Sequence, residues 1–119
     1  MCAGKHRLAN LTVIIDYNKQ QSYDSTFKIQ NLEPFASKWQ SFGFTVKEVD
    51  GHDVSALRRM FRQLPFEINR PSALICHTVK GKGIPFVEGN LNWHHKSRIS
   101  DDDIQALIQG LTGSDRLAL

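Results

Sequence analysis

The sequence is poor in cysteine and has no long apolar run, and each absence excludes a class of protein. Its 119 residues include only two cysteines, Cys2 and Cys76, too few for the disulfide framework of a small secreted domain. No apolar stretch reaches the length of about 20 residues that a membrane-spanning helix needs. The first ten residues are mixed and polar, unlike a secretory signal. We therefore expect reduced thiols, a cytoplasmic location and no membrane contact.

The net charge is small, and the sequence shows no repeat. A formal net charge of +3 gives no reason to expect a nucleic-acid partner. The chain has no internal repeat or low-complexity tract, and its 40% hydrophobic and 23% charged residues are typical of a globular protein. Residues 1–111 are expected to form one domain. Residues 112–119 are expected to be a C-terminal tail, since they lack a clear amphipathic pattern.

Three apolar segments predict strands. Residues 11–15 are rich in β-branched side chains, and they predict a central parallel strand that is covered on both faces. Residues 44–49 alternate between apolar and polar side chains, and residues 72–79 form another apolar run. Each of these two segments predicts a further strand.

Three segments show apolar residues at helical spacing: 32–42, 54–64 and 101–111. Gly43 marks the end of the first, and Asp53 is a suitable N-cap for the second. Ser100, followed by three aspartates, predicts the N-cap, capping box and negative first turn of the third. The order strand, helix, strand, helix, strand, loop, helix predicts an α/β fold with part of a doubly wound parallel sheet.

Polar residues follow the predicted strands at one edge of this sheet. Asp16, Tyr17 and Asn18 come directly after the first run, and a loop rich in glycine and lysine follows the third. Because ligands bind at the carboxyl ends of the strands in open α/β sheets, we expect a ligand site there.

Four blocks carry a resemblance to a known family. They are the sequences at residues 10–19 (NLTVIIDYNK), 48–54 (EVDGHDV), 77–83 (HTVKGKG) and 93–94 (WH). In this order and spacing they resemble the thiamine-diphosphate-binding domain of transketolases, most closely the bacterial forms in which the N-terminal section is a separate subunit. The resemblance implies a thiamine-diphosphate-binding fold. It also implies a transferase that moves a two-carbon ketol unit between sugar phosphates.

The resemblance also implies roles for individual residues. The side chain of Asn18 and the backbone carbonyl of Gln20 would bind Mg²⁺, which holds the cofactor diphosphate; hard oxygen ligands suit this ion. Lys80 would lie near the diphosphate, where a lysine serves as a point charge. His94 would be catalytic and would reach both the cofactor and the sugar.

Two departures from the family pattern qualify these roles. The family has a Gly-Asp-Gly turn before the strand, and its aspartate is a third metal ligand, but no such turn precedes Asn18. We therefore expect an N-terminally truncated chain that binds the cofactor weakly or not at all, and is inactive, on its own. A partner subunit would supply the aminopyrimidine-binding domain, within an oligomer. His95 also stands where the family often has glycine.

Other interpretations stay open. A related thiamine-diphosphate enzyme, deoxyxylulose-phosphate synthase or a ketoacid dehydrogenase component, would share the first block, although Trp93 and His94 favour transketolase. A non-catalytic α/β module that pairs with a full-length partner is a second possibility. A zinc set is disfavoured because adjacent histidine side chains usually diverge and no C-x-x-C is present; its members would be Cys76, His77, His94 and His95. Lys82 and Lys96 are interpreted as a solvated rim, and His52 as a structural turn residue.

Overall fold

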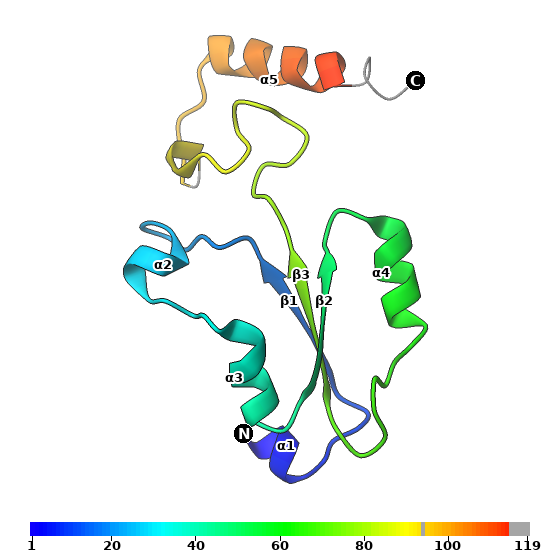
Figure 1. Ribbon diagram of the computed structural model, residues 1–119. Helices are drawn as coiled ribbons and strands as arrows, with labels where there is room; N and C mark the ends of the chain where they lie inside the picture. The colour runs from blue at the N-terminus through cyan, green and yellow to red at the C-terminus, as the bar shows by residue number, and fades with distance from the viewer. Residues whose placement is uncertain (94, 115–119) are drawn as a thin grey trace.

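A computed structural model describes residues 1–93 and 95–114 and shows three parallel strands in one sheet (Figure 1). The strands are β1 (Thr12–Tyr17), β2 (Thr45–Asp50) and β3 (Ser72–His77), in the spatial order β1-β3-β2. Ser72 lies opposite Thr12 on one side and Thr45 on the other, so all three strands start level. The predicted α/β fold with a parallel sheet is confirmed.

The position of the first strand was predicted wrongly. β3 is the central strand, and its residues Ala73, Leu74 and Ile75 are almost completely buried. β1 lies at an edge of the sheet within the described part of the chain, and Ile14 is 56% exposed. The apolar run at residues 11–15 therefore predicts a strand but not its position in the sheet. Among the described strands, β3 is the one with a hydrogen-bonded neighbour on each side.

The strand order determines where the helices lie. The chain passes from β1 over β3 to β2 and then returns to β3. Parallel crossovers are almost always right-handed, and two right-handed crossovers that run in opposite directions place their helices on opposite faces of the sheet. Figure 1 shows α3 and α4 on either side of the strands accordingly. The helices are α1 (Cys2–Lys5), α2 (Thr26–Ile29), α3 (Phe35–Ser41), α4 (Val54–Phe61) and α5 (Asp101–Ser114), with a 3-10 turn η1 (Leu91–Trp93).

Two helices are shorter than predicted. α3 begins at Phe35, directly after Pro34, so Leu32 lies outside it; it ends before Gly43, which has a φ of +89°. α4 ends at Phe61. Its apolar stripe is not buried as expected, since Val54 is 68% and Phe61 43% exposed. Asp53 does cap this helix, and its carboxylate accepts a 2.8 Å hydrogen bond from the N–H of Ala56.

Aromatic rings connect the end of β1 to α3. The ring of Tyr17 lies 4.9 Å from that of Phe35, which lies 6.2 Å from Trp39, and Trp39 lies 5.0 Å from Phe44. Tyr17 and Phe44 are buried. Since aromatic pairs at these separations attract each other beyond their buried area, this row fixes the carboxyl end of β1 against one face of the domain.

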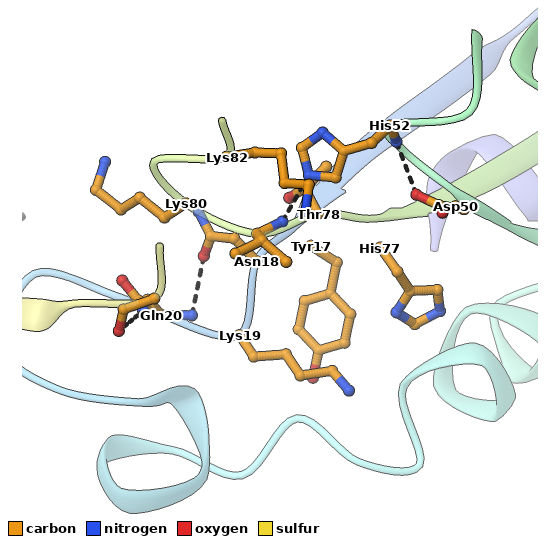
Figure 2. A pocket seen from close by; sticks show the side chains of 12 residues that line it. Tyr17, Asn18, Lys19, Gln20, Asp50, His52, His77, Thr78, Lys80 and Lys82 are labelled. Carbon is orange, nitrogen blue, oxygen red and sulfur yellow. Dashed lines mark hydrogen bonds between the residues drawn. The ribbon is translucent and has the colours of Figure 1, made fainter. Parts of the chain in front are cut away.

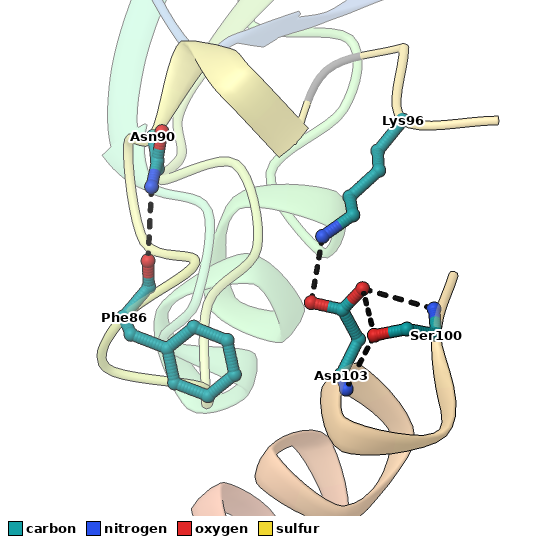
Figure 3. Close-up of polar contacts among 5 residues, drawn as sticks. All are labelled: Phe86, Asn90, Lys96, Ser100 and Asp103. Carbon is teal, nitrogen blue, oxygen red and sulfur yellow. Dashed lines mark hydrogen bonds and ion pairs between the residues drawn. The ribbon is translucent and has the colours of Figure 1, made fainter. Parts of the chain in front are cut away.

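α5 begins with the predicted capping box (Figure 3) and ends at Ser114. The carboxylate of Asp103 accepts hydrogen bonds from the N–H and hydroxyl of Ser100 at 3.0 and 2.9 Å, and the N–H of Asp103 donates to the Ser100 hydroxyl at 3.2 Å. Lys96 lies 2.7 Å from the same carboxylate. Lys96 and Ser100 together lower the pKa of Asp103 to about 2.

Contacts within residues 84–93 hold this part of the chain after β3. The Asn90 side chain donates to the carbonyl of Phe86 at 3.2 Å (Figure 3), and the Phe86 and Trp93 rings meet edge to face at 5.6 Å. A Cβ at Gly110 would lie 3.1 Å from Ile84, so α5 packs closely on this loop. Among the described helices none combines the length and apolarity that crossing a membrane requires.

Candidate functional site

An open pocket of about 730 Å³ lies at the carboxyl ends of the three strands (Figure 2). The end of β1, the turn between β2 and α4, and the segment that leaves β3 surround it. The pocket is therefore at the sheet edge where the sequence predicts a ligand site. It is lined by Tyr17, Asn18, Lys19, Gln20, Asp50, His52, His77, Thr78, Val79, Lys80, Lys82 and Gly89.

Asn18 is the first residue after β1 and organises a tight turn. Its side-chain oxygen accepts a 2.9 Å hydrogen bond from the N–H of Gln20 (Figure 2). Lys19 has a φ of +60°, and its carbonyl accepts a 2.9 Å bond from the N–H of Thr26. The carbonyl of Gln20 accepts no hydrogen bond within the described part of the chain. The turn thus leaves this carbonyl and the second lone pair of the Asn18 amide oxygen available to a ligand.

The side chain of Gln20 contributes in a way that the sequence did not predict. Its Nε2 donates a 3.0 Å hydrogen bond to the carbonyl of Gly89, in the loop after β3. Its Oε1 is buried and has no hydrogen-bond partner within residues 1–93 and 95–114. A buried unsatisfied oxygen is costly, so this atom is an additional acceptor beside the pocket. No sequence pattern predicts such a contact, because it joins two loops distant in the chain.

The segment that leaves β3 brings lysines to the pocket. The Thr78 hydroxyl donates to the carboxylate of Asp16 on β1, which anchors the start of this segment. Lys80 follows and lines the pocket, as Lys82 does. The carbonyl of Lys80 accepts a 2.9 Å bond from the N–H of Gly89, which closes the loop into a compact unit.

Glu88 holds the tip of this loop. Its carboxylate accepts a 3.1 Å hydrogen bond from the N–H of Gly83 and lies 3.3 Å from the ammonium of Lys82. The Gly83 N–H, more than Lys82, holds the pKa of Glu88 below its usual value. Lys82 therefore lines the pocket while it forms an ion pair with Glu88. No carboxylate pairs with Lys80 among the described residues.

The turn after β2 closes the third side of the pocket. The N–H of Gly51 donates to the carbonyl of His77 at 2.8 Å, and a Cβ at Gly51 would lie 2.5 Å from the Thr78 methyl. The Asp50 carboxylate accepts from the N–H of His52 at 2.8 Å (Figure 2). His52 is a turn residue, as expected, but its ring also reaches the segment after β3, where Nε2 accepts a 2.8 Å bond from the N–H of Val79.

Two polar pairs lie beside the pocket. The Tyr17 hydroxyl donates to Glu33 at 2.8 Å, and His77 lies 2.6 Å from the Glu48 carboxylate. Burial and then the bond to Glu33 raise the pKa of Tyr17. The N–H of Phe35, followed by Tyr17, lowers the pKa of Glu33. Both pairs therefore hold Tyr17 and His77 in the wall of the pocket. The carboxylates of Glu33 and Glu48 are hydrogen-bonded to these two side chains.

None of the remaining residues considered in the sequence analysis is described as part of the pocket lining. His94, the predicted catalytic residue, lies outside the described residues. Lys96 lies 4.2 Å from the centre of the Trp93 ring and is paired with Asp103, so it is away from the pocket lining. Cys76 is buried in β3, and burial followed by the charge of Asp16 raises the pKa of its thiol.

The donor set of the pocket suits a phosphate group better than a bare metal ion. Within residues 1–93 and 95–114, no three His, Cys, Asp or Glu side chains are grouped to hold a metal. Asn18 and Gln20 offer neutral oxygens, while Asp16 and Asp50 already accept hydrogen bonds from Thr78 and His52. A divalent ion here would need charged oxygens from its ligand.

Comparisons with known proteins show which proteins this chain resembles. Residues 1–116 match the family model described as the transketolase, thiamine diphosphate binding domain. The chain is 37% identical over 95 residues to one of the subunits of apulose-4-phosphate transketolase from Phocaeicola vulgatus. It is 39% identical over 95 residues to 6-deoxy-6-sulfo-D-fructose transketolase subunit SqwG of a Clostridium species. Each match covers 80% of this chain and 34% of the relative.

Solved structures show the same relationship. Transketolase from Campylobacter jejuni superposes with a TM-score of 0.76 at 25% identity, over 92% of this chain and 17% of that one. The Pichia stipitis transketolase crystallised with sedoheptulose-7-phosphate gives a TM-score of 0.77 at 25% identity, over 93% and 16%. The chain thus spans about a third of the curated subunits and about a sixth of the solved chains.

Proposed function

This chain belongs to the transketolase family, within its thiamine-diphosphate-binding domain, and from that premise we propose that its pocket holds the diphosphate of thiamine diphosphate. The observation that carries the proposal is the position of Lys80. This lysine lines the pocket together with the turn at Asn18, and it has no carboxylate partner among the described residues. An ammonium group at the edge of a parallel sheet is well suited to a phosphate group.

Mg²⁺ would complete the site. The Asn18 side-chain oxygen and the Gln20 carbonyl would be its protein ligands, and both belong to the turn after β1. Because neither oxygen is charged, phosphate oxygens and water would have to supply the rest of the octahedral shell. We therefore propose that metal and cofactor bind together, and that the described chain binds them weakly. When bound, thiamine diphosphate supplies the carbanion chemistry.

The remaining roles concern the reaction. We propose a transferase that moves a two-carbon ketol unit between sugar phosphates, with His94 contacting both the cofactor and the sugar. The names of two relatives as subunits of sugar transketolases support this proposal. They also support a partner subunit, which would carry the aminopyrimidine-binding domain within an oligomer. A cytoplasmic location stays a prediction and agrees with two free cysteines.

The test is a two-dimensional NMR titration of the ¹⁵N-labelled chain with thiamine diphosphate and Mg²⁺ up to millimolar concentrations, a range that detects weak binding. We expect amide shifts confined to the turn at Asn18 and to residues 78–82. Mg²⁺ alone, which has only two neutral protein oxygens, should shift these amides much less. Shifts elsewhere, or none, would show that the pocket is not the diphosphate site.

The role of His94 needs the partner subunit. A His94→Ala variant, assayed with a transketolase partner subunit that restores ketol transfer, should lose most activity while keeping the cofactor. His95→Ala is the matched control, since it changes the adjacent histidine. Equal activity of the two variants would remove His94 from the proposed mechanism.

A further inference from the structure

His52 connects the turn after β2 to the segment that carries Lys80. Its Nε2 lies 2.8 Å from the N–H of Val79, the residue directly before Lys80. Within the described part of the chain, that N–H has no other acceptor. The contact therefore satisfies a backbone donor that β3, which ends at His77, no longer pairs.

The bond requires a particular form of the imidazole. Because the N–H of Val79 is the donor, Nε2 must present its lone pair, and the ring hydrogen is then on Nδ1. The backbone of His52 is itself held, since its N–H donates to Asp50 at 2.8 Å. The close approach of Gly51 to Thr78 brings the whole turn against the end of β3. His52 is thus placed to act as a fixed acceptor.

The segment before Lys80 has two anchors that differ in origin. Thr78 is held by β1, through its hydroxyl to Asp16 and its N–H to the carbonyl of Tyr17 at 3.3 Å. Among the described residues, the N–H of Val79 is held by His52 alone, while the Val79 carbonyl accepts a 3.2 Å bond from the N–H of Lys82 in the same loop. We propose that His52 is a positioning residue, which holds Val79 so that the ammonium of Lys80 faces the diphosphate pocket. This inference rests on the proposed function of the pocket.

Charges around His52 come from several elements. Asp50 is the last residue of β2, Glu88 interacts with His52 from the loop after β3, and Lys80 and Lys82 line the same pocket. Neither carboxylate accepts from the Val79 N–H in the structure, since Asp50 accepts from the N–H of His52 and Glu88 from the N–H of Gly83, and a lysine ammonium has no acceptor. Removal of the ring nitrogen therefore leaves the Val79 N–H unpaired.

The test compares two substitutions at the same position in the ¹⁵N-labelled chain. His52→Phe keeps a ring but removes the acceptor, and His52→Gln keeps an acceptor of similar reach. We expect His52→Phe to lose the hydrogen-exchange protection of the Val79 amide and to weaken the binding of thiamine diphosphate with Mg²⁺ about threefold to tenfold, the range for one hydrogen bond. His52→Gln should restore both.

The controls separate this inference from the proposed function. His6→Phe, at the C-cap of α1, should change neither quantity. If the wild-type chain does not bind thiamine diphosphate, the proposed function fails, and loss of Val79 protection in His52→Phe with its rescue in His52→Gln still supports the anchor. Full Val79 protection in His52→Phe, or failure of rescue in His52→Gln, overturns the inference.

Discussion

The side chain of Gln20 donates a 3.0 Å hydrogen bond to the carbonyl of Gly89, 69 positions along the chain. This bond joins the turn after β1 to the loop after β3, so the two segments that line the pocket are held together before any ligand enters. Gly89 in turn donates to the carbonyl of Lys80. The proposed metal half and the proposed phosphate half of the site are therefore connected through one residue.

Loss of this connection should lower stability. We expect Gln20→Leu to reduce the free energy of unfolding by about 1 kcal/mol, because it removes one hydrogen bond and leaves the Gly89 carbonyl without it. Urea denaturation followed by circular dichroism measures the change. Gln105→Leu, on the exposed surface of α5, is the control. An unchanged midpoint for Gln20→Leu would mean that the two loops are held by other contacts.

The turn at Gly51 should tolerate no side chain. A Cβ there would lie 2.5 Å from the Thr78 methyl and 3.1 Å from the His77 carbonyl, so we expect Gly51→Ala to cost about 1–3 kcal/mol of unfolding free energy. Thr78→Ser removes the methyl and keeps the hydroxyl that donates to Asp16. The double variant should recover part of the loss in urea denaturation; no loss in Gly51→Ala would contradict the observed packing.

The two thiols should react at very different rates. Cys2 is exposed, whereas Cys76 is buried in β3, and burial and the charge of Asp16 raise the pKa of the Cys76 thiol. Because the thiolate is the reactive form, a disulfide reagent should modify Cys2 quickly and Cys76 only in denaturant. Cys2→Ser isolates the second rate. Rapid reaction of Cys76 in the native Cys2→Ser chain would contradict the buried position of β3.

The start of α5 should depend on pH. Its capping carboxylate, Asp103, has a pKa of about 2, below its usual 3.8. A lowered folded-state pKa adds stability above the unfolded value, and this contribution disappears as the pH falls from about 4 to about 2. Asp103→Asn should therefore melt at a lower temperature at pH 7, with the difference shrinking near pH 2. Asp102→Asn, in the same first turn, is the control. A difference that stays constant with pH would be evidence against the Lys96 and Ser100 contacts.

The sequence predicted the elements better than their arrangement. Apolar periodicity located three strands and the helices α3, α4 and α5, because local patterns report which segments are amphipathic. The prediction placed the first strand at the centre of the sheet, whereas β1 lies at an edge of the described sheet. An apolar run does not show whether a strand has a neighbour on one side or on both sides. α2 was not predicted, because its four residues Thr26–Ile29 follow a polar stretch with no helical period.

For the site, the sequence predicted some of the residues but not the contacts between distant loops. Asn18, Gln20 and Lys80 line one pocket, and their roles toward a metal or a cofactor stay predictions. The side chain of Gln20 and the ring of His52 were missed, because each contacts a residue far along the chain and no short motif predicts such a partner. His94 lies outside the described residues, and its role stays a prediction.

The dependence of binding on the diphosphate tests the central proposal most directly. NMR titration should give a clearly higher affinity for thiamine diphosphate with Mg²⁺ than for thiamine with Mg²⁺. Lys80→Ala should reduce that preference, and Lys5→Ala, on α1, should leave it unchanged. Equal affinity for the two ligands, or an undiminished preference in Lys80→Ala, would contradict the assignment of this pocket to the cofactor diphosphate.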